Sequence, residues 1–179
     1  QRIVVEKPDN LQSSIRIASP LFTKEHPDFH KVKVLNTILG GYFGSRLMRN
    51  IREEKGLTYG VNSGIIALLN AGYFIVGTDV RKDNTAQAID EIYKEIVQLQ
   101  QVAVPHSELN TVKNYMAGRL LSSVDTPFAL AEKFKNVYLY GLTYDFYKSY
   151  LNTINTITAE ELQETARKYL TTASMQEVI

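Results

Sequence analysis

Several features are missing from this chain of 179 residues. It has no cysteine, which excludes disulfides, thiolate metal sites and cysteine nucleophiles but does not fix the compartment. No apolar run approaches the roughly 18 residues that a membrane-spanning helix needs. Lysine and arginine together number 20 and aspartate and glutamate 19, so no net charge attracts nucleic acid or a membrane surface. We therefore expect neither of these as a partner.

The two ends lack features as well. The chain opens with Gln1 rather than an initiator Met, and no charged segment leads into an apolar one there. The last six residues, SMQEVI, are typical of a strand that has barely begun. These observations predict an excised or processed piece of a longer polypeptide. They leave a bacterial cytoplasm and a periplasm both open as compartments for a soluble protein.

The order of the expected elements predicts the fold class. Strands are expected at RIVVE, SSIRIASPLF, LTYGVNSGII and AGYFIVGTDV, with a hairpin at LLNAG. Two helices, over 28–39 and 45–55, separate the first and second strand pairs, and the rest of the chain is mostly helical. This order favours an α+β fold in which an antiparallel-rich sheet packs against helices as a two-layer sandwich. No linker or repeat interrupts residues 1–179, which predicts a single domain.

Helix ends carry the clearest local signals. Asp28 is placed to cap the first helix, and Asp83 to open the long helix after the second strand pair. Gly56 is placed to stop the second helix and Gly141 a later one. Thr158 and Glu161 in TAEE have the spacing of a capping box, and Thr126-Pro127 that of a cap followed by proline at the first helical position.

The histidines suggest a metal site only weakly. His26 and His30 in HPDFH have a spacing that can bind zinc on one helix face, but Phe29 stands where the inverted zinc-peptidase motif H-x-x-E-H needs its glutamate. The alternative, a solvated loop before a helix, is favoured, and we expect no tight zinc binding. His106, one residue past a proline, is expected to be an ordinary surface histidine.

The most site-like stretch is GGYFGSRLMRNIREEKGLTYGV, residues 40–61. Its glycines lack the spacing of a phosphate-binding or dinucleotide-binding loop, and a tight helix–helix turn explains them better. Arg52 could simply complement a helix C-terminus, and Tyr59, alternating with Leu57 and Val61, could be half-buried in a strand. Glu53 and Glu54 could pair with neighbouring cations in solvent.

A longer run, NTILGGYFGSRLMRNIREEKGLTYGVNS, closely resembles the C-terminal, non-metal-binding homologous domain of insulinase-type, or pitrilysin-like, zinc metallopeptidases. The shared letters are L-G-G, S-R-L and R-E-x-x-G-L-x-Y, and ITAEELQETARKYL is similar to the family's final helix. The resemblance implies one half of a clam-shaped peptidase, whose other half, on the same chain or a separate subunit, binds zinc. It also implies that Arg52 and Tyr59, seven residues apart, contact the substrate carbonyl in the transition state.

The resemblance sets further expectations. H-x-x-E-H is absent, so no hydrolysis and no metal are expected in this chain alone, and zinc is expected on the partner half. The expected partners are that homologous half and a peptide substrate, with self-association of the isolated chain as a further possibility. The alternative is a catalytically silent structural or assembly subunit of the same fold.

Overall fold

In the computed structural model, which describes residues 1–179, five strands form one sheet in the order β1-β5-β2-β4-β3. The long strands β2 (Gln12–Leu21) and β4 (Gly72–Arg81) pair antiparallel, and β3 (Val61–Ala67) pairs antiparallel with the outer side of β4. On the other side, β5 (Gln176–Val178) is antiparallel to β2, and β1 (Arg2–Ile3) is parallel to β5. The prediction of an antiparallel-rich α+β fold is confirmed, with a first strand shorter than expected.

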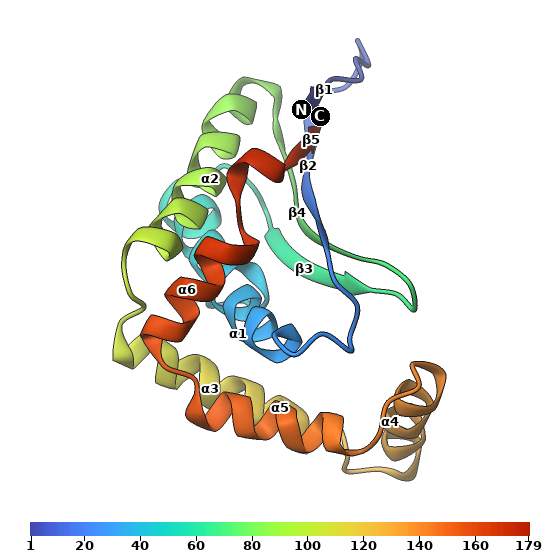
Figure 1. Ribbon diagram of the computed structural model, residues 1–179. Helices are drawn as coiled ribbons and strands as arrows, with labels where there is room; N and C mark the ends of the chain where they lie inside the picture. Colours follow the sequence, from blue (N-terminus) through green and yellow to red (C-terminus); the bar gives the residue numbers. More distant parts are fainter.

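Helices cover one face of this sheet (Figure 1). They are α1 (Phe29–Gly40), α2 (Thr85–Gln101) and α6 (Ala159–Tyr169). Because strand side chains alternate between faces, Ile15 is fully buried under these helices while its neighbour Arg16 is exposed. The expected two-layer sandwich is confirmed, and the opposite face of the sheet carries no helical layer (Figure 1).

The remaining helices lie beyond the sheet. Helices α3 (His106–Ser122) and α5 (Asp145–Thr156) contact each other, and both pack against α1 of the helical layer. Helix α4 (Pro127–Leu139) lies apart from the sheet in Figure 1, and Val137 is its one buried residue. No helix is both long enough and apolar enough to cross a membrane.

The predicted helix caps are confirmed at most helix ends. The Thr158 hydroxyl accepts a hydrogen bond from the Glu161 amide at 3.2 Å, and the Glu161 carboxylate accepts one from the Thr158 amide at 3.1 Å. Gly56 and Gly141 have φ angles of +61° and +62°, the left-handed conformation that glycine adopts without strain. The Thr126 hydroxyl accepts a hydrogen bond from the Ala129 amide at 3.1 Å.

Two expected helix starts need correction. Asp28 does precede α1, but its side chain makes no cap hydrogen bond. Its carboxylate accepts hydrogen bonds from the Lys168 ammonium at 3.0 Å and from the Tyr169 hydroxyl at 2.5 Å instead. Asp83 lies in a short 3₁₀ turn, η2 (Lys82–Asn84), and α2 begins after it at Thr85.

Candidate functional site

Arg52 lies in the last turn of η1 (Met48–Glu54), a helical segment with π geometry in which the Lys55 amide bonds the Asn50 carbonyl at 3.1 Å. The Arg52 side chain forms no hydrogen bond or ion pair within the chain. Its guanidinium carbon lies 4.7 Å from the centroid of the exposed Phe43 ring, a cation–π distance. A cation that meets only an aromatic face is free to donate all its hydrogen bonds to another group.

The expected pairing of Glu53 and Glu54 with nearby cations is wrong. Both carboxylates are exposed and form no ion pair. Arg49 bonds Glu108 at 3.0 Å instead, and Lys55 lies 3.3 Å from Glu91. These acids stand on α3 and α2. Arg49 and Lys55 therefore pair with carboxylates of other helices rather than with Glu53 and Glu54 beside them in the sequence.

Tyr59 is 95% exposed, and the expectation of a half-buried strand position is wrong. The residue lies before β3, which begins only at Val61. The chain turns at Gly56, where the Leu57 amide donates to the Ile51 carbonyl at 2.9 Å, and Leu57 then packs against the core. Tyr59 therefore follows a turn that is fixed by backbone contacts while its own ring is left in solvent.

Threonine hydroxyls fix the backbone on both sides of Tyr59. The Thr58 hydroxyl donates to the Asp79 carbonyl at 2.8 Å and accepts from the Gly60 amide at 3.2 Å. The Thr78 hydroxyl donates to the Gly60 carbonyl at 2.9 Å. These contacts join the segment to β4, so the outward direction of the tyrosine is set by the fold.

A hollow of about 290 Å³ lies on the uncovered face of the sheet, and its lining includes Gly60, the residue after Tyr59. Gly60 lines it, together with residues of β2, β3 and β4 that include Arg16, Asn62, Gly77 and Asp79. The Arg16 side chain lies across Gly77 in this hollow, with its Cδ atom 3.5 Å from the place where a Cβ atom of Gly77 would stand.

The glycine turn before η1 serves packing, as expected. A Cβ atom on Gly40 would lie 2.6 Å from the Ser63 amide nitrogen and 2.9 Å from the Leu47 side chain. Such distances do not occur between real side-chain atoms, so only glycine permits α1, η1 and β3 to meet at this point.

His30 does not lie in a solvated loop, which corrects that expectation. It is the second residue of α1 and is buried, with its ring 4.5 Å from that of Phe146. Burial, and then the nearby charge of Lys33, lower the pKa of His30 to about 4. Its Nδ1 atom has no hydrogen-bond partner. His26, outside the helix, stacks on Phe22 with ring centroids 3.9 Å apart.

The structure brings no metal-binding set together. No group of three histidine, aspartate or glutamate side chains is placed to hold an ion. His106 is exposed at the start of α3, as expected, with its Nδ1 atom 3.1 Å from the Asn110 side-chain nitrogen.

Sequence reasoning missed three residues that shape this site. Phe43 supplies the face under Arg52, and Thr58 and Thr78 hold the segment that presents Tyr59. The sequence gives no signal for Phe43, because it stands between glycines without helical or strand periodicity. Thr58 stands beside Tyr59, but its partners on β4 are about twenty residues away.

Comparison with known proteins decides the family. The family model described as the peptidase M16 inactive domain matches residues 1–116. This chain belongs to that family. The M16 inactive domain from Pseudomonas fluorescens has a solved structure that is similar to this one, with a TM-score of 0.87 at 25% identity over 99% of this chain and 42% of that one. The resemblance to insulinase-type peptidases is thereby confirmed.

Curated relatives of this M16 domain are much longer than it is. The uncharacterized zinc protease YmxG of Bacillus subtilis is 27% identical over 147 residues, which cover 82% of this chain and 36% of that protein. The non-peptidase homolog YmxG of Helicobacter pylori is also 27% identical, over 161 residues that cover 87% of this chain and 36% of that protein. The chain therefore spans about a third of the length of the curated relatives that it matches.

Proposed function

We propose that this chain is the non-metal half of a zinc-dependent endopeptidase and completes an active site with a homologous zinc-bearing half. The observation that carries the proposal is the state of Arg52 and Tyr59. Both belong to the motif that resembles the peptidase family, Tyr59 is 95% exposed, and neither side chain is used in an ion pair or hydrogen bond within the chain. The chain itself has no residues that fit zinc, so metal chemistry would come from the other half.

The chemistry of the pair suits the carbonyl group of a peptide under attack. Negative charge develops on the carbonyl oxygen in the transition state, and donors placed there stabilise it. The phenol of Tyr59 offers one donor and the guanidinium of Arg52 five in a fixed fork. A backbone held by Thr58 and Thr78 lets Tyr59 act without a large reorganisation cost, which is the basis of such preorganised stabilisation.

The experiment mixes this protein with its zinc-bearing half and measures peptide cleavage. Tyr59→Phe removes one hydroxyl and keeps the ring, so kcat is expected to fall by about 10²- to 10³-fold, as for the loss of one oxyanion donor. KM should stay nearly constant, because the lost interaction is made only in the transition state. Arg52→Lys should also reduce kcat, since an ammonium does not reproduce the guanidinium fork.

Tyr138→Phe on α4 is the matched control, because Tyr138 is also strongly exposed but lies outside the motif. It should leave kcat unchanged. Wild-type kcat in folded Tyr59→Phe and Arg52→Lys variants would remove both residues from the active site. A zinc half that cleaves just as fast alone would end the shared-site proposal.

A second candidate function is a silent assembly subunit. One finding favours it: the Helicobacter pylori relative is named a non-peptidase homolog. This role predicts a stable complex of the two halves that cleaves no peptide, and the same mixing experiment distinguishes the two functions.

A further inference from the structure

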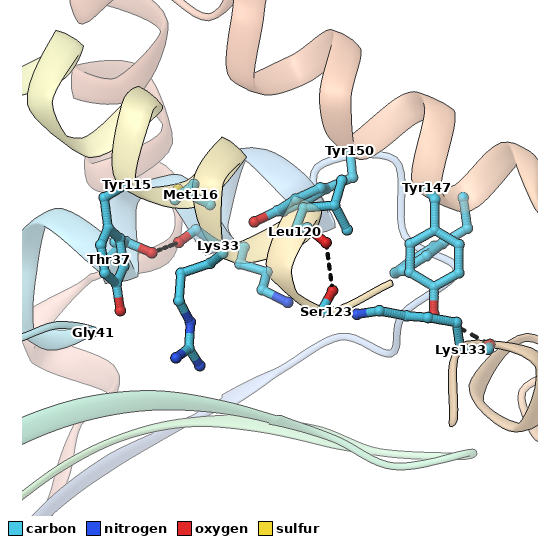
Figure 2. A pocket seen from close by; sticks show the side chains of 12 residues that line it. Lys33, Thr37, Gly41, Tyr115, Met116, Leu120, Ser123, Lys133, Tyr147 and Tyr150 are labelled. Atoms are coloured by element: carbon cyan, nitrogen blue, oxygen red, sulfur yellow. Dashed lines mark hydrogen bonds between the residues drawn. The ribbon is translucent and has the colours of Figure 1, made fainter. Parts of the chain in front are cut away.

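A pocket of about 280 Å³ opens between α1, α3, α4 and α5 (Figure 2). Three cations line it, each from a different helix: Lys33 on α1, Arg119 on α3 and Lys133 on α4. None of the lining residues is an aspartate or glutamate. We call this the cationic pocket, and it is separate from the Arg52 and Tyr59 motif.

The three charges of the cationic pocket have no counter-charge. The head groups of Lys33, Arg119 and Lys133 form no ion pair and no hydrogen bond in the structure, whereas Lys31, two residues from Lys33, reaches Glu161 at 3.1 Å. Figure 2 shows the Lys33 and Lys133 side chains pointing toward one another across the pocket. Lys33 and Arg119 are exposed residues and Lys133 is half-buried, so water rather than a carboxylate solvates these clustered charges.

The protonation behaviour agrees with this geometry. Enclosure by protein, followed by repulsion from Lys133 and Lys24, lowers the pKa of Lys33. Enclosure, followed by repulsion from Arg119, lowers the pKa of Lys133. Lys33 and Arg119 are nevertheless reached by solvent, so a small ligand can reach them as well. The pocket concentrates positive charge that the fold itself does not neutralise.

The walls of the cationic pocket add a second kind of contact. Tyr115, Tyr147 and Tyr150 line it, with the Lys133 ammonium 5.3 Å from the Tyr147 ring centroid and the Lys33 ammonium 5.4 Å from that of Tyr150. Enclosure raises the pKa of Tyr147 and of Tyr150, so both phenols stay neutral. The Tyr147 hydroxyl donates to the Lys133 carbonyl at 3.3 Å, whereas the Tyr150 hydroxyl has no such bond and can donate to a ligand. Aromatic walls with a few convergent polar groups are typical of small-molecule sites.

We propose that the cationic pocket binds a small organic anion, with its carboxylate or phosphate held by Lys33, Arg119 and Lys133 and its body against the tyrosines. Arg119 can contact an oxyanion with two parallel hydrogen bonds, while the two lysines act as point charges. A bound anion would also connect α4, which has little buried surface of its own, to α1. The proposal does not depend on the peptidase role.

The test titrates the 179-residue protein with inorganic phosphate and, separately, with succinate at constant ionic strength, and follows amide chemical shifts. We expect saturable binding that shifts residues of α1, α3 and the α4–α5 region. Lys33→Gln and Arg119→Gln should each weaken binding about tenfold or more, since a hydrogen bond to a charged group contributes about 1.5–3 kcal/mol. The anion that binds more tightly identifies the group as phosphate or carboxylate.

Lys135→Gln is the matched control, because Lys135 stands on α4 two residues from Lys133 but pairs with Glu132 outside the pocket. It should leave the dissociation constant within about twofold of the wild type. Without anion, Lys33→Gln should not lower the melting temperature, because it removes a charge that repels Lys133. If Lys33→Gln does not fold, Lys133→Gln tests the same loss of repulsion and of anion binding. Absence of saturable binding by either anion, or equal weakening by Lys135→Gln, would overturn the proposal.

Discussion

Two groups of cations in this molecule differ in whether a carboxylate pairs with them. Arg46 is bound by Glu108 through two hydrogen bonds of 3.0 and 2.8 Å, with side-chain exposures of 10% and 14%, and Arg49 adds a third contact to the same carboxylate. The cationic pocket, by contrast, gathers its lysines and arginine without any acid among its lining residues. Arg52, on the same helical segment as Arg49, meets only an aromatic ring.

We call a cation structural when a carboxylate of the chain pairs with it, and available when no such partner exists. Arg46, two residues before η1, connects this part of the chain to α3, and leaving its nearly buried charge unpaired would cost several kcal/mol. The cations of the cationic pocket and Arg52 stand where solvent reaches them, so the fold tolerates them without partners. Cations that are clustered or aligned without a partner in the chain are candidates for binding a group from outside it.

The largest expected effect comes from removing the charge of Glu108. Glu108→Gln keeps the shape of the side chain but leaves Arg46 nearly buried without a counter-charge. We expect the free energy of unfolding to fall by about 3 kcal/mol, the lower end for breaking a buried pair, as measured by urea denaturation. Glu132→Gln, which breaks the exposed pair with Lys135, should cost less than about 1 kcal/mol. Equal losses in the two variants would erase the distinction between paired and available cations.

A change of pH creates a new unpaired cation at His30. Its pKa is lowered from 6.5 to about 4 in the folded state, so between these values the unfolded chain binds more protons than the folded one. Stability is therefore complete above pH 6.5 and is lost as the pH falls toward 4, at a slope of up to about 1.4 kcal/mol per pH unit.

His30→Leu is the matched variant for this pH dependence, because it fills the aromatic surroundings and removes the titrating ring. Plotted against pH, the free energies of unfolding of the two proteins should run parallel above pH 6.5. Below pH 6.5 the wild type should lose stability faster than His30→Leu. Parallel curves between pH 4 and 6.5 would show that His30 is not held neutral by burial.

The parts of the fold that could be predicted depend on few neighbouring residues. The capping box of Thr158 and Glu161 lies within a single turn of helix, and the left-handed stop at Gly56 depends on that glycine alone. The family motif likewise joins Arg52 and Tyr59 within one short run of the chain. The capping box and the glycine stop follow from local sterics and hydrogen bonding, whereas the pair of Arg52 and Tyr59 is predicted only through the resemblance to the peptidase family.

What could not be predicted depends on contacts between distant residues. Tyr59 lies in a segment before β3 that is bonded to β4 through Thr58 and Asp79, and nothing near Tyr59 in the sequence indicates that contact. The cationic pocket joins position 33 to positions 119 and 133, and no spacing along the chain links them. Packing of α3, α4 and α5 against α1 creates this pocket.

The smallest expected effect is the loss of Arg52. If this cation is available rather than structural, Arg52→Ala removes only its interaction with the helix dipole and the Phe43 ring, each contributing about 0.3–1 kcal/mol at an exposed site. The melting temperature of Arg52→Ala should stay close to that of the wild type, whereas Arg46→Ala, which strands Glu108 beside a single exposed arginine, should unfold at a clearly lower temperature. Circular dichroism melts of the two variants, taken side by side in the same buffer, measure this contrast around one helical segment. Arg52→Ala melting as early as Arg46→Ala would mean that both arginines are structural, and any loss of cleavage in Arg52 variants would then reflect folding rather than contact with substrate.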